Sequence, residues 1–587
     1  MTSLIKRRNR NDKIFKLALE AGISPLLSHI LACRLTDYEG DIDGIIRPSL
    51  KYIDHPELLQ DADRAAGRIA SAIVARERIG VLTDYDVDGI TSHAIICRAL
   101  TEYFGFSADK IDNLIGHRIN DGYGVSEGLT ARILAQTALP AVIITADCGS
   151  ADNSQIARLK AAGIDVVITD HHAIAIEGIP ESAFAVVNPT RPDCRYPDST
   201  IAGCMVAWLL MSQVRSKLVE RGYLSPDSPK LAKELDYVSL GTVADCVSIG
   251  TTINRAVVSI GLKFMNRFDR PCWRAIRALL GKDGQWFNSE DLGFQIAPRI
   301  NARSRLADPY AALKYLLADN DEDAGHYLSM LDLDNLDRRK IEHQMVEVAK
   351  QHAQHQVMQG RSAVVVYLQE GHPGVQGIVA SRLVQVFGRP AIVLCNSSNP
   401  EQLTGSSRSI PELHIRDALQ QVADSRPDVF IRFGGHKGAA GFTIYRTKLA
   451  VFHELFEKTA RIRLTGVDLA PTVWTDGELE TALISLNTLE QLDQLQPYGR
   501  EFEPPVFENV FKVTAIRRVG PQAVHLALAL RVEDNTYKAI WFRALGAENE
   551  PLPLAMGDTV RCAFRLVLNE FRGAKNLNLI LEHACRV

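Results

Sequence analysis

The sequence predicts an α/β protein of several domains, built around a parallel sheet and ending in a β-barrel. Three observations lead to this prediction. Short apolar runs alternate with helical stretches between about residues 76 and 260, as in a parallel α/β sheet. A Pro-free stretch rich in helix formers follows at 320–360, and five strand-like runs come after residue 510. A chain of 587 residues is also too long for one hydrophobic core, so we expect two to four domains.

The predicted segments follow one another along the chain. They are a polar helical segment at 1–75, an α/β domain at 76–320, a connecting helix at 321–360, a smaller α/β domain at 361–465 and a β-rich domain at 466–587. The basic run Lys6–Arg10 is expected to be a solvated terminus. Five short strands near the end of the chain fit an OB-like barrel.

Composition limits the classes of function. Hydrophobic residues make up 46% and charged residues 23% of the chain, as in an ordinary globular protein. The formal net charge of −4 means that any site for a polyanion must be a local basic patch. Ten Cys without a CxxC pair argue against a zinc ribbon and favour free thiols in a reducing compartment. Because the chain lacks a signal-peptide pattern and a long apolar run, we expect a cytoplasmic protein without a membrane segment.

Three of the apolar runs in the first α/β domain end in an aspartate. The run "IGVLTD" ends in Asp84, "AVIITAD" ends in Asp147 and "DVVITD" ends in Asp170. In an open parallel sheet, ligand sites lie beyond the carboxyl ends of the strands. The three aspartates are therefore expected to converge on one crevice.

The first of these aspartates belongs to an acidic motif, "TDYDVDGITS". Asp84, Asp86 and Asp88 occupy alternate positions, so in an extended backbone all three would project from one face. Neighbouring like charges are unfavourable without a cation, and oxygen ligands of this kind suit Mg²⁺ or Mn²⁺. Taken alone, an acidic turn after a strand explains the motif equally well.

The third aspartate is followed by two histidines. A strand that delivers Asp170, His171 and His172 in succession is costly to bury unless the groups are paired or bind a metal. Asp245, in "LGTVADCVS", adds a further carboxylate. Carboxylates together with imidazoles favour Mn²⁺, and the set could hold two ions about 3.5–4 Å apart, which would stabilise an in-line displacement at phosphorus.

The motifs "DYDVDG", "TAD", "TDHH" and "GTVAD", in this order, resemble the four metal motifs of the DHH phosphoesterase superfamily. Further segments resemble its RecJ family of single-strand-specific 5′→3′ DNA exonucleases, from about residue 80 to the C-terminus. These segments are "HRINDGYGVS" (117–126), "VVNP" (186–189), "DLGFQIAPRINARSRL" (291–306), "HPGVQGIVASRL" (372–383), "GSSRSIP" (405–411) and "RFGGHKGAAGFTI" (432–444). The resemblance implies a DHH domain, a long connecting helix, a smaller DHH-associated domain and a C-terminal OB-fold, with the DNA strand between the first and third of these.

The resemblance also implies roles for individual residues. The catalytic metal ligands, for two Mn²⁺ or Mg²⁺ ions, fall on Asp84, Asp86, Asp147, His171, His172 and Asp245. Asp170 is either a ligand or an orienting residue, and Asp88 is expected to be structural, capping the following turn. The residues implied to line the DNA path and the 5′-phosphate pocket are Arg118, Arg299, Arg305, Ser406, Arg408, Gly435 and His436. Guanidinium groups can hold phosphate through two hydrogen bonds, which suits arginine for this role.

The sequence departs from the family pattern at two places. Leu82 stands where many family members have a histidine that could be an extra ligand. Near the end of the chain, "PYGREFEPP" (497–505) has Glu501, Phe502 and Glu503 where Gly, Asn and Pro are usual. We expect the second departure to affect DNA contacts or a partner surface and not the metal chemistry.

The leading hypothesis is a metal-dependent exonuclease of DNA repair or recombination that degrades single-stranded DNA 5′→3′ to nucleoside 5′-monophosphates. Its partner is single-stranded DNA, with a single-strand-binding protein or a helicase as further candidates. In the OB-like domain, Trp541 and Phe571 are candidate stacking platforms flanked by Arg543, Arg572 and Lys575, although both aromatic residues could instead be barrel core. The alternatives are a DHH phosphodiesterase acting on oligonucleotides or cyclic dinucleotides, which would not need the OB-like domain, and an inactive DHH scaffold protein, which would not need the complete ligand set.

Overall fold

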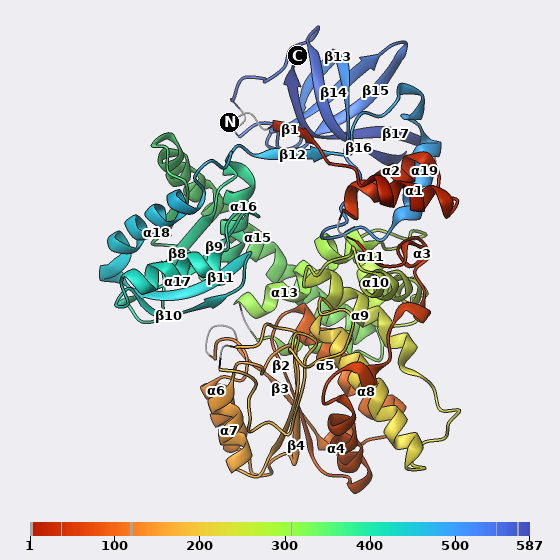
Figure 1. Cartoon of the computed structure of the whole chain (residues 1–587), viewed down its shortest axis with the longest axis vertical. Helices are drawn as coiled ribbons and strands as arrows, with labels where there is room; N and C mark the ends of the chain where they lie inside the picture. The colour runs from red at the N-terminus through yellow and green to blue at the C-terminus, as the bar shows by residue number, and fades with distance from the viewer. Residues whose placement is uncertain are drawn as a thin grey trace. The chain divides into compact units, whose positions relative to one another are not determined.

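The computed structural model describes residues 4–36, 38–117, 121–175, 177–306, 308–546, 549–571 and 574–587 (Figure 1). The chain divides into two compact units. The parallel-sheet unit contains Asp37–Leu336 and Leu495–Glu503, and the barrel unit contains Met1–Thr36, Asp337–Gln494 and Pro504–Val587. Within the described residues, no helix is both long and apolar enough to cross a membrane.

The parallel-sheet unit contains the predicted parallel sheet. Its strands are β2 (Ile79–Thr83), β3 (Ile111–Ile115), β4 (Val142–Ala146), β5 (Asp165–Thr169) and β6 (Ala185–Val187). They lie in the order β3-β2-β4-β5-β6, and every neighbouring pair is parallel. Residues of β2 and β4 are buried throughout, which explains why these strands read as continuous apolar runs.

Helices cover both faces of this sheet (Figure 1). The helices of the unit are α3 (Ile42–Ile46), α4 (Ala62–Ala75), α5 (Val87–Arg98), α6 (Glu127–Leu134), α7 (Asn153–Ala161), α8 (Gly203–Glu220), α9 (Leu235–Ala244), α10 (Thr252–Met265), α11 (Pro271–Leu279), α12 (Ser289–Asp291), α13 (Ala297–Leu306) and α14 (Tyr310–Leu316). Helices α6 and α7 contribute Leu129 and Ile156 to one core cluster, and α4, α5, α8 and α9 supply much of the other. A sheet covered on both faces leaves its strand ends as the place for polar groups.

The predicted connecting helix is confirmed as α15 (Asp321–Met358). Near its start, Leu328 and Leu331 are buried in the core of the parallel-sheet unit. Farther along, Ala349 and Ala353 are buried with β7 and α16 of the barrel unit. The helix therefore contributes to two separate cores.

The barrel unit begins its α/β part with a mixed sheet in the order β10-β11-β9-β8-β7. The strands are β7 (Val364–Leu368), β8 (Ala391–Asn396), β9 (Gln402–Arg408), β10 (Phe430–Gly435) and β11 (Ala439–Tyr445), and the helices are α16 (Gln376–Phe387), α17 (Ile415–Ser425) and α18 (Leu449–Arg463). Only the β7–β8 pair is parallel within this sheet. The second, smaller α/β domain predicted from the sequence is thus present.

A closed five-stranded barrel follows the short helix α19 (Leu486–Leu492), in the order β13-β14-β15-β17-β16. Its strands are β13 (Phe507–Val519), β14 (His525–Val532), β15 (Asn535–Trp541), β16 (Thr559–Phe571) and β17 (Ala574–Arg586). Four of them contain a whole strand-like run read from the sequence, and β15 contains the first five residues of the run "YKAIWFRA", which continues into a turn. The predicted OB-like barrel is confirmed.

The first residues differ from the expected solvated helical terminus. Leu4–Arg7 forms strand β1, which pairs in parallel with β12 (Thr472–Thr475), ahead of helices α1 (Asp12–Glu20) and α2 (Pro25–Arg34). Arg7 forms an ion pair with buried Glu508. A buried carboxylate is costly unless it is paired, which explains why part of the basic run is held in place.

Candidate metal centre

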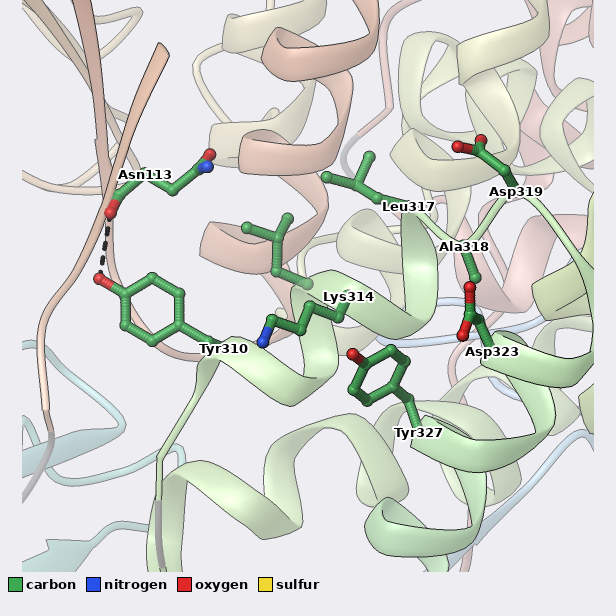
Figure 2. A pocket seen from close by; sticks show the side chains of 9 residues that line it. Asn113, Tyr310, Lys314, Leu317, Ala318, Asp319, Asp323 and Tyr327 are labelled. Carbon is green, nitrogen blue, oxygen red and sulfur yellow. Dashed lines mark hydrogen bonds between the residues drawn. The ribbon is translucent and has the colours of Figure 1, made fainter. Parts of the chain in front are cut away.

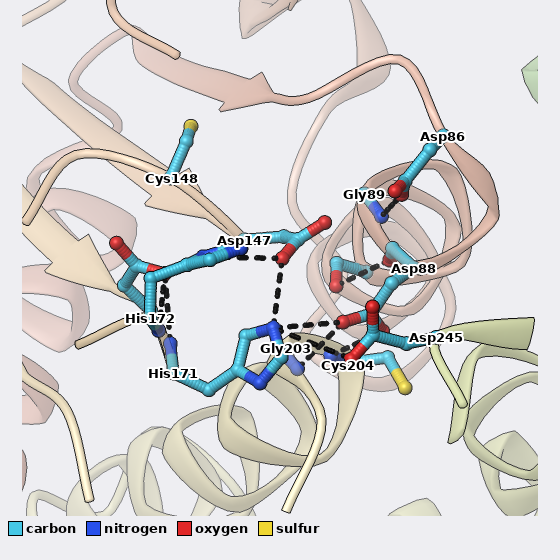
Figure 3. Close-up of polar contacts among 12 residues, drawn as sticks. Asp86, Asp88, Gly89, Asp147, Cys148, His171, His172, Gly203, Cys204 and Asp245 are labelled. Atoms are coloured by element: carbon cyan, nitrogen blue, oxygen red, sulfur yellow. Dashed lines mark hydrogen bonds and ion pairs between the residues drawn. The ribbon is translucent and has the colours of Figure 1, made fainter. Parts of the chain in front are cut away.

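Carboxylates at the strand ends come together with other acidic residues and with histidines, and Figure 3 shows Asp147 among them. Asp84 follows β2, Asp147 follows β4 and Asp170 follows β5, and these strands are neighbours in the sheet. Among the described residues, three groups have ligand atoms within 4.8 Å of one another. They are Asp147–His171–His172, Asp88–His171–Asp245 and Asp84–Asp86–Asp147. All six predicted ligands are in these groups, together with Asp88.

The acidic motif after β2 does not continue as a strand. Helix α5 begins at Val87, and Asp86 caps it by accepting a hydrogen bond from the Gly89 backbone N–H at 3.1 Å. The condition of an extended backbone is therefore not met, because Asp88 lies in the first turn of a helix. The cap on the following turn is made by Asp86 and not by Asp88.

Asp88 has a different position from the one expected. Its buried carboxylate accepts hydrogen bonds from the backbone N–H groups of Gly203 at 2.7 Å and Cys204 at 2.9 Å, at the start of α8. It also lies 3.7 Å from Nε2 of His171. A Cβ atom at Gly203 would lie 2.9 Å from Cβ of Asp147, so glycine allows α8 to approach. Asp88 therefore holds the start of α8, and it is also a member of one of the three ligand groups.

His171 belongs to two of the three ligand groups. Its Nε2 atom lies 3.2 Å from Asp147, 3.6 Å from Asp245 and 3.7 Å from Asp88, and Figure 3 shows the ring pointing among these carboxylates. Burial lowers the pKa of His171, which favours the neutral imidazole that binds metals. Asp245 reaches this position from the C-terminal end of α9.

Asp170 is arranged as an orienting residue. Its carboxylate accepts hydrogen bonds from the backbone N–H groups of Ser150 at 3.0 Å, His171 at 2.8 Å and His172 at 3.1 Å, and from Nδ1 of His172 at 2.8 Å. Burial would raise the pKa of Asp170, but the hydrogen bond and charge of His172 lower it below the ordinary value. None of the three ligand groups contains Asp170, so the second of its two predicted roles fits better.

Two residues of this centre were not assigned a role from the sequence. The Tyr123 hydroxyl donates to the backbone carbonyl of Asp147 and lies 3.1 Å from Nδ1 of His172. Asn188 donates from Nδ2 to Oγ of Ser150 at 3.0 Å and to the carbonyl of His172 at 2.9 Å. Both belong to segments that resemble the family, and the sequence offers no other indication that they lie at the metal centre.

The electrostatics of the cluster indicate a cation site. Burial raises the pKa of Asp147 well above its ordinary value, and the carboxylates of Asp88, Asp86, Asp245 and Asp84 raise it further. Oδ1 of Asp147 and Nε2 of His171 are buried, and neither makes a hydrogen bond within the part of the chain that the structure describes. So many acids are costly to ionise together without a positive ion. Oxygen and imidazole donors fit Mn²⁺ or Mg²⁺.

Leu82 contributes no ligand atom to this centre. Its side chain is completely buried on β2 and packs in the core cluster that contains Leu114 and Val125. The substitution of leucine for the usual histidine thus replaces a potential ligand with a core side chain.

The residues of the barrel unit that are expected to hold the 5′-phosphate come from one mixed sheet and one of its turns. Ser406 and Arg408 are on β9, and β11 separates them from Gly435 on β10. A Cβ atom at Gly377, in the first turn of α16, would lie 2.9 Å from Nη2 of Arg408 and 3.0 Å from Oγ of Ser406. A hydroxyl, a guanidinium and a helix N-terminus are groups that bind anions. We call Ser406, Arg408, Gly435 and His436 the basic cradle.

Gly435 and His436 lie where β10 turns into β11. Gly435 has φ +145°, and a Cβ atom there would lie 2.4 Å from Cα of Ala440, so the close strand pairing requires glycine. Nδ1 of His436 accepts a hydrogen bond from the backbone N–H of Gly438 at 3.3 Å. The backbone of this turn therefore lies close to the end of β9 that carries Arg408.

The other arginines expected on the DNA path differ in position. Arg299 is buried and donates from Nε to Asp332 at 2.8 Å, which ties α13 to α15. This ion pair gives Arg299 a charge partner inside the unit, and its contact with DNA stays a prediction. Arg305 lies on the same helix, α13. Arg118 lies outside the described residues.

The barrel corrects one aromatic candidate. Trp541 is only 9% exposed and packs edge-on against His583, with ring centroids 5.6 Å apart, so it is core. Its neighbour Phe542 is 52% exposed and lies beside His525. Arg543 and Lys575 are exposed, whereas Arg572 and the side chain of Phe571 lie outside the described residues.

A separate pocket of about 330 Å³ lies in the parallel-sheet unit (Figure 2). Its lining includes Asn113, Tyr310, Lys314 and Tyr327, and the Tyr310 hydroxyl donates to the Asn113 carbonyl. It shares no residue with the three ligand groups. The pocket is therefore not part of the candidate metal centre.

Comparisons with known proteins agree with the domain organisation. Models of the DHH family N-terminal domain, the DHHA1 domain and the RecJ OB domain match residues 78–242, 360–461 and 475–583. The single-stranded-DNA-specific exonuclease RecJ of Dickeya dadantii is 32% identical over 96% of both chains, and that of Haemophilus influenzae is 32% identical over 99% of both. The crystal structure of RecJ from Thermus thermophilus in complex with Mn²⁺ covers 100% of this chain and 80% of its own, with a TM-score of 0.78 at 24% identity. A manganese-bound exonuclease RecJ is 29% identical, with a TM-score of 0.57, over 70% of this chain and 98% of its own. With relatives more than 30% identical over nearly its whole length, the chain belongs to the RecJ family of DHH phosphoesterases.

Proposed function

We propose that this chain is a metal-dependent exonuclease that hydrolyses single-stranded DNA from the 5′ end and releases nucleoside 5′-monophosphates. The observation that carries the proposal is that the three ligand groups share members. Asp147 belongs to two of the groups, and so does His171. The names of the relatives, which are single-stranded-DNA-specific exonucleases, supply the substrate. A single-strand-binding protein or a helicase that exposes such strands is the proposed kind of partner.

The proposed cofactor is Mn²⁺ or Mg²⁺, in two ions held by Asp84, Asp86, Asp147, His171, His172 and Asp245. Bound ions of this kind supply Lewis-acid stabilisation of the charge that develops at phosphorus during in-line displacement. The manganese- and magnesium-bound RecJ structures support this choice.

The chain's own residues prepare this centre. The carboxylate of Asp170 and Nδ1 of His172 share a hydrogen bond, which orients the ring of that proposed ligand. Asn188 and Tyr123 hold the loop that carries the two histidines. The basic cradle would hold the 5′-terminal phosphate and thereby set the polarity.

The closed barrel and the basic cradle favour DNA strands over small substrates such as cyclic dinucleotides. The complete set of ligand residues argues against an inactive scaffold protein. The test uses labelled DNA and RNA strands with free or blocked ends, with Mn²⁺, with Mg²⁺ and with EDTA. We expect metal-dependent release of 5′-mononucleotides from free 5′ ends of single-stranded DNA. Cleavage only of dinucleotides, or equal digestion of strands blocked at the 5′ end, would contradict the proposal.

A further inference from the structure

Residues Leu495–Glu503 belong to the parallel-sheet unit although the residues on either side belong to the barrel unit. We call them the returning segment. It contains the departure from the family pattern at Glu501–Glu503, which we expected to leave the metal chemistry untouched. In the structure, the returning segment lies beside the ligand Asp245.

A buried arginine anchors the returning segment. Arg255 is completely buried and donates hydrogen bonds to the carbonyls of Leu495 at 2.7 Å and Pro497 at 3.0 Å. Its guanidinium lies 4.2 Å from the ring centroid of Phe502, which is itself fully buried. Phe502 is therefore the hydrophobic anchor of the segment.

The anchored segment ends in a tight turn. The backbone groups of Gly499 and Phe502 bond to each other at 3.0 and 3.2 Å, so Arg500 and Glu501 form the tip. Glu501 has φ +62°, and the Arg500 carbonyl accepts a hydrogen bond from the N–H of Ile249 at 2.9 Å. A Cβ atom at Gly499 would lie 2.5 Å from Cγ1 of Ile249, so glycine is required for this close approach.

The turn places a cation at the acidic centre. Nη1 of Arg500 donates to the carbonyl of Cys246 at 3.2 Å, and Cys246 follows Asp245 directly. Burial and neighbouring carboxylates raise the pKa of Asp245, and the positive charge of Arg500 acts in the opposite direction. The Arg500 side chain is 58% exposed, and its Nε atom lies 3.8 Å from the Glu501 carboxylate, beyond hydrogen-bond distance, so N–H donors of its guanidinium can still reach a ligand.

We propose that Arg500 is a substrate-contacting residue, which donates to a non-bridging oxygen of the phosphodiester that the metal centre cleaves. A guanidinium next to the ions would neutralise charge that develops on phosphorus and fix the phosphate in a defined orientation. The inference rests on the proposed nuclease function and adds a positive group, carried by the returning segment, to a centre otherwise made of acids and imidazoles.

The test compares wild-type protein with Arg500→Ala and Arg500→Lys on a 5′-phosphorylated oligothymidylate with Mn²⁺. We expect Arg500→Ala to lower kcat/KM by about 10- to 100-fold, the equivalent of one hydrogen bond to a charged group, and added guanidinium ions to restore part of it. Arg500→Lys should retain an intermediate rate. Binding of thymidine 5′-monophosphate to the Mn²⁺-loaded protein, measured by calorimetry, should weaken in Arg500→Ala.

Glu501→Gln is the matched control, because it changes the other residue of the same tip and removes a charge of the opposite sign. It should not reduce kcat/KM. A wild-type rate for Arg500→Ala would overturn the inference, and so would a slower variant that also loses Mn²⁺ affinity or thermal stability and is not rescued by guanidinium. Absence of cleavage by the wild-type protein would instead refute the proposed function.

Discussion

In the parallel-sheet unit the polar site residues gather beyond the strand ends, whereas in the barrel unit two of the cradle residues lie within a strand. Asp84, Asp147 and Asp170 follow β2, β4 and β5, but Ser406 and Arg408 are part of β9. The first arrangement brings loops and helix starts together, so several carboxylates and imidazoles can face one point. The second displays a few side chains along a sheet, which suits one phosphate better than a metal cluster.

The two sites also differ in charge. The acidic centre is unfavourable without a cation, since burial and mutual repulsion raise the pKa of both Asp147 and Asp245. The basic cradle carries the guanidinium of Arg408 and the hydroxyl of Ser406, which are groups that bind anions and not metal ions. We therefore expect metal removal to affect the chemistry far more than the capture of a 5′-phosphate, and each prediction below tests that separation.

The largest effect is expected for Asp147→Asn, because Asp147 belongs to two of the ligand groups. It should lower kcat by at least about 10²–10³-fold, the cost of one stabilising group in a preorganised site. Affinity for 5′-phosphorylated strands in EDTA should stay unchanged, which fluorescence anisotropy can measure. Asp109→Asn, at an exposed aspartate of the same unit, is the control. Near-wild-type turnover of folded Asp147→Asn would remove the basis for the ligand assignment.

Asp170→Asn should have a smaller effect. An amide cannot accept all the hydrogen bonds that orient His172, and loss of such a partner typically costs about 10- to 100-fold in metal affinity or activity. Titration with Mn²⁺ should therefore show weaker binding, and higher Mn²⁺ should recover part of the rate. If the variant binds Mn²⁺ with the affinity of the wild-type protein, Asp170 does not act through His172.

Arg408→Ala tests the other region. It should weaken the preference for a 5′-phosphate over a 5′-hydroxyl by about 10-fold, as expected for one charge-assisted hydrogen bond. Mn²⁺ affinity should not change, because no residue of the ligand groups lies in the barrel unit. Arg426→Ala, at an exposed arginine paired with Asp428, is the matched control. A simultaneous loss of Mn²⁺ affinity would show that the two regions are not separable.

The two regions also differ in how far the sequence predicted them. An apolar run that ends in aspartate is a local pattern, so β2, β4 and β5 and their carboxylates could be read directly. The basic cradle was found only through family resemblance, because "GSSRS" has no periodicity or ligand spacing that indicates phosphate. The predicted barrel strands were also local patterns, and all were present.

What the sequence could not predict depends on contacts between distant residues. Asp88 was expected to cap the next turn, but it caps α8, which begins more than a hundred positions later along the chain. Phe502 looked like a departure from a pattern, and only its packing on Arg255 explains it. Trp541 and Phe542 are adjacent in one apolar run, but β15 ends at Trp541 and Phe542 lies in the turn that follows, which depends on how the closed barrel forms.

Phe542 gives the smallest expected effect and tests whether the barrel forms a third functional region. Its side chain is 52% exposed beside His525, while Trp541 is core, so a base can stack only on the former. Phe542→Ala should weaken binding of long single strands by about 1 kcal/mol, the lower end of the range for one stacked base, and leave thermal stability and cleavage of very short strands unchanged. Removal of the charge at Arg543 or Lys575 should reduce the salt dependence of binding by about one phosphate contact each. Truncation near residue 508 is a less specific test, because Glu508 pairs with Arg7 and Arg561 and its loss would disturb the barrel itself. An equal loss on short and long strands in Phe542→Ala would show that this side chain supports the fold instead of the DNA.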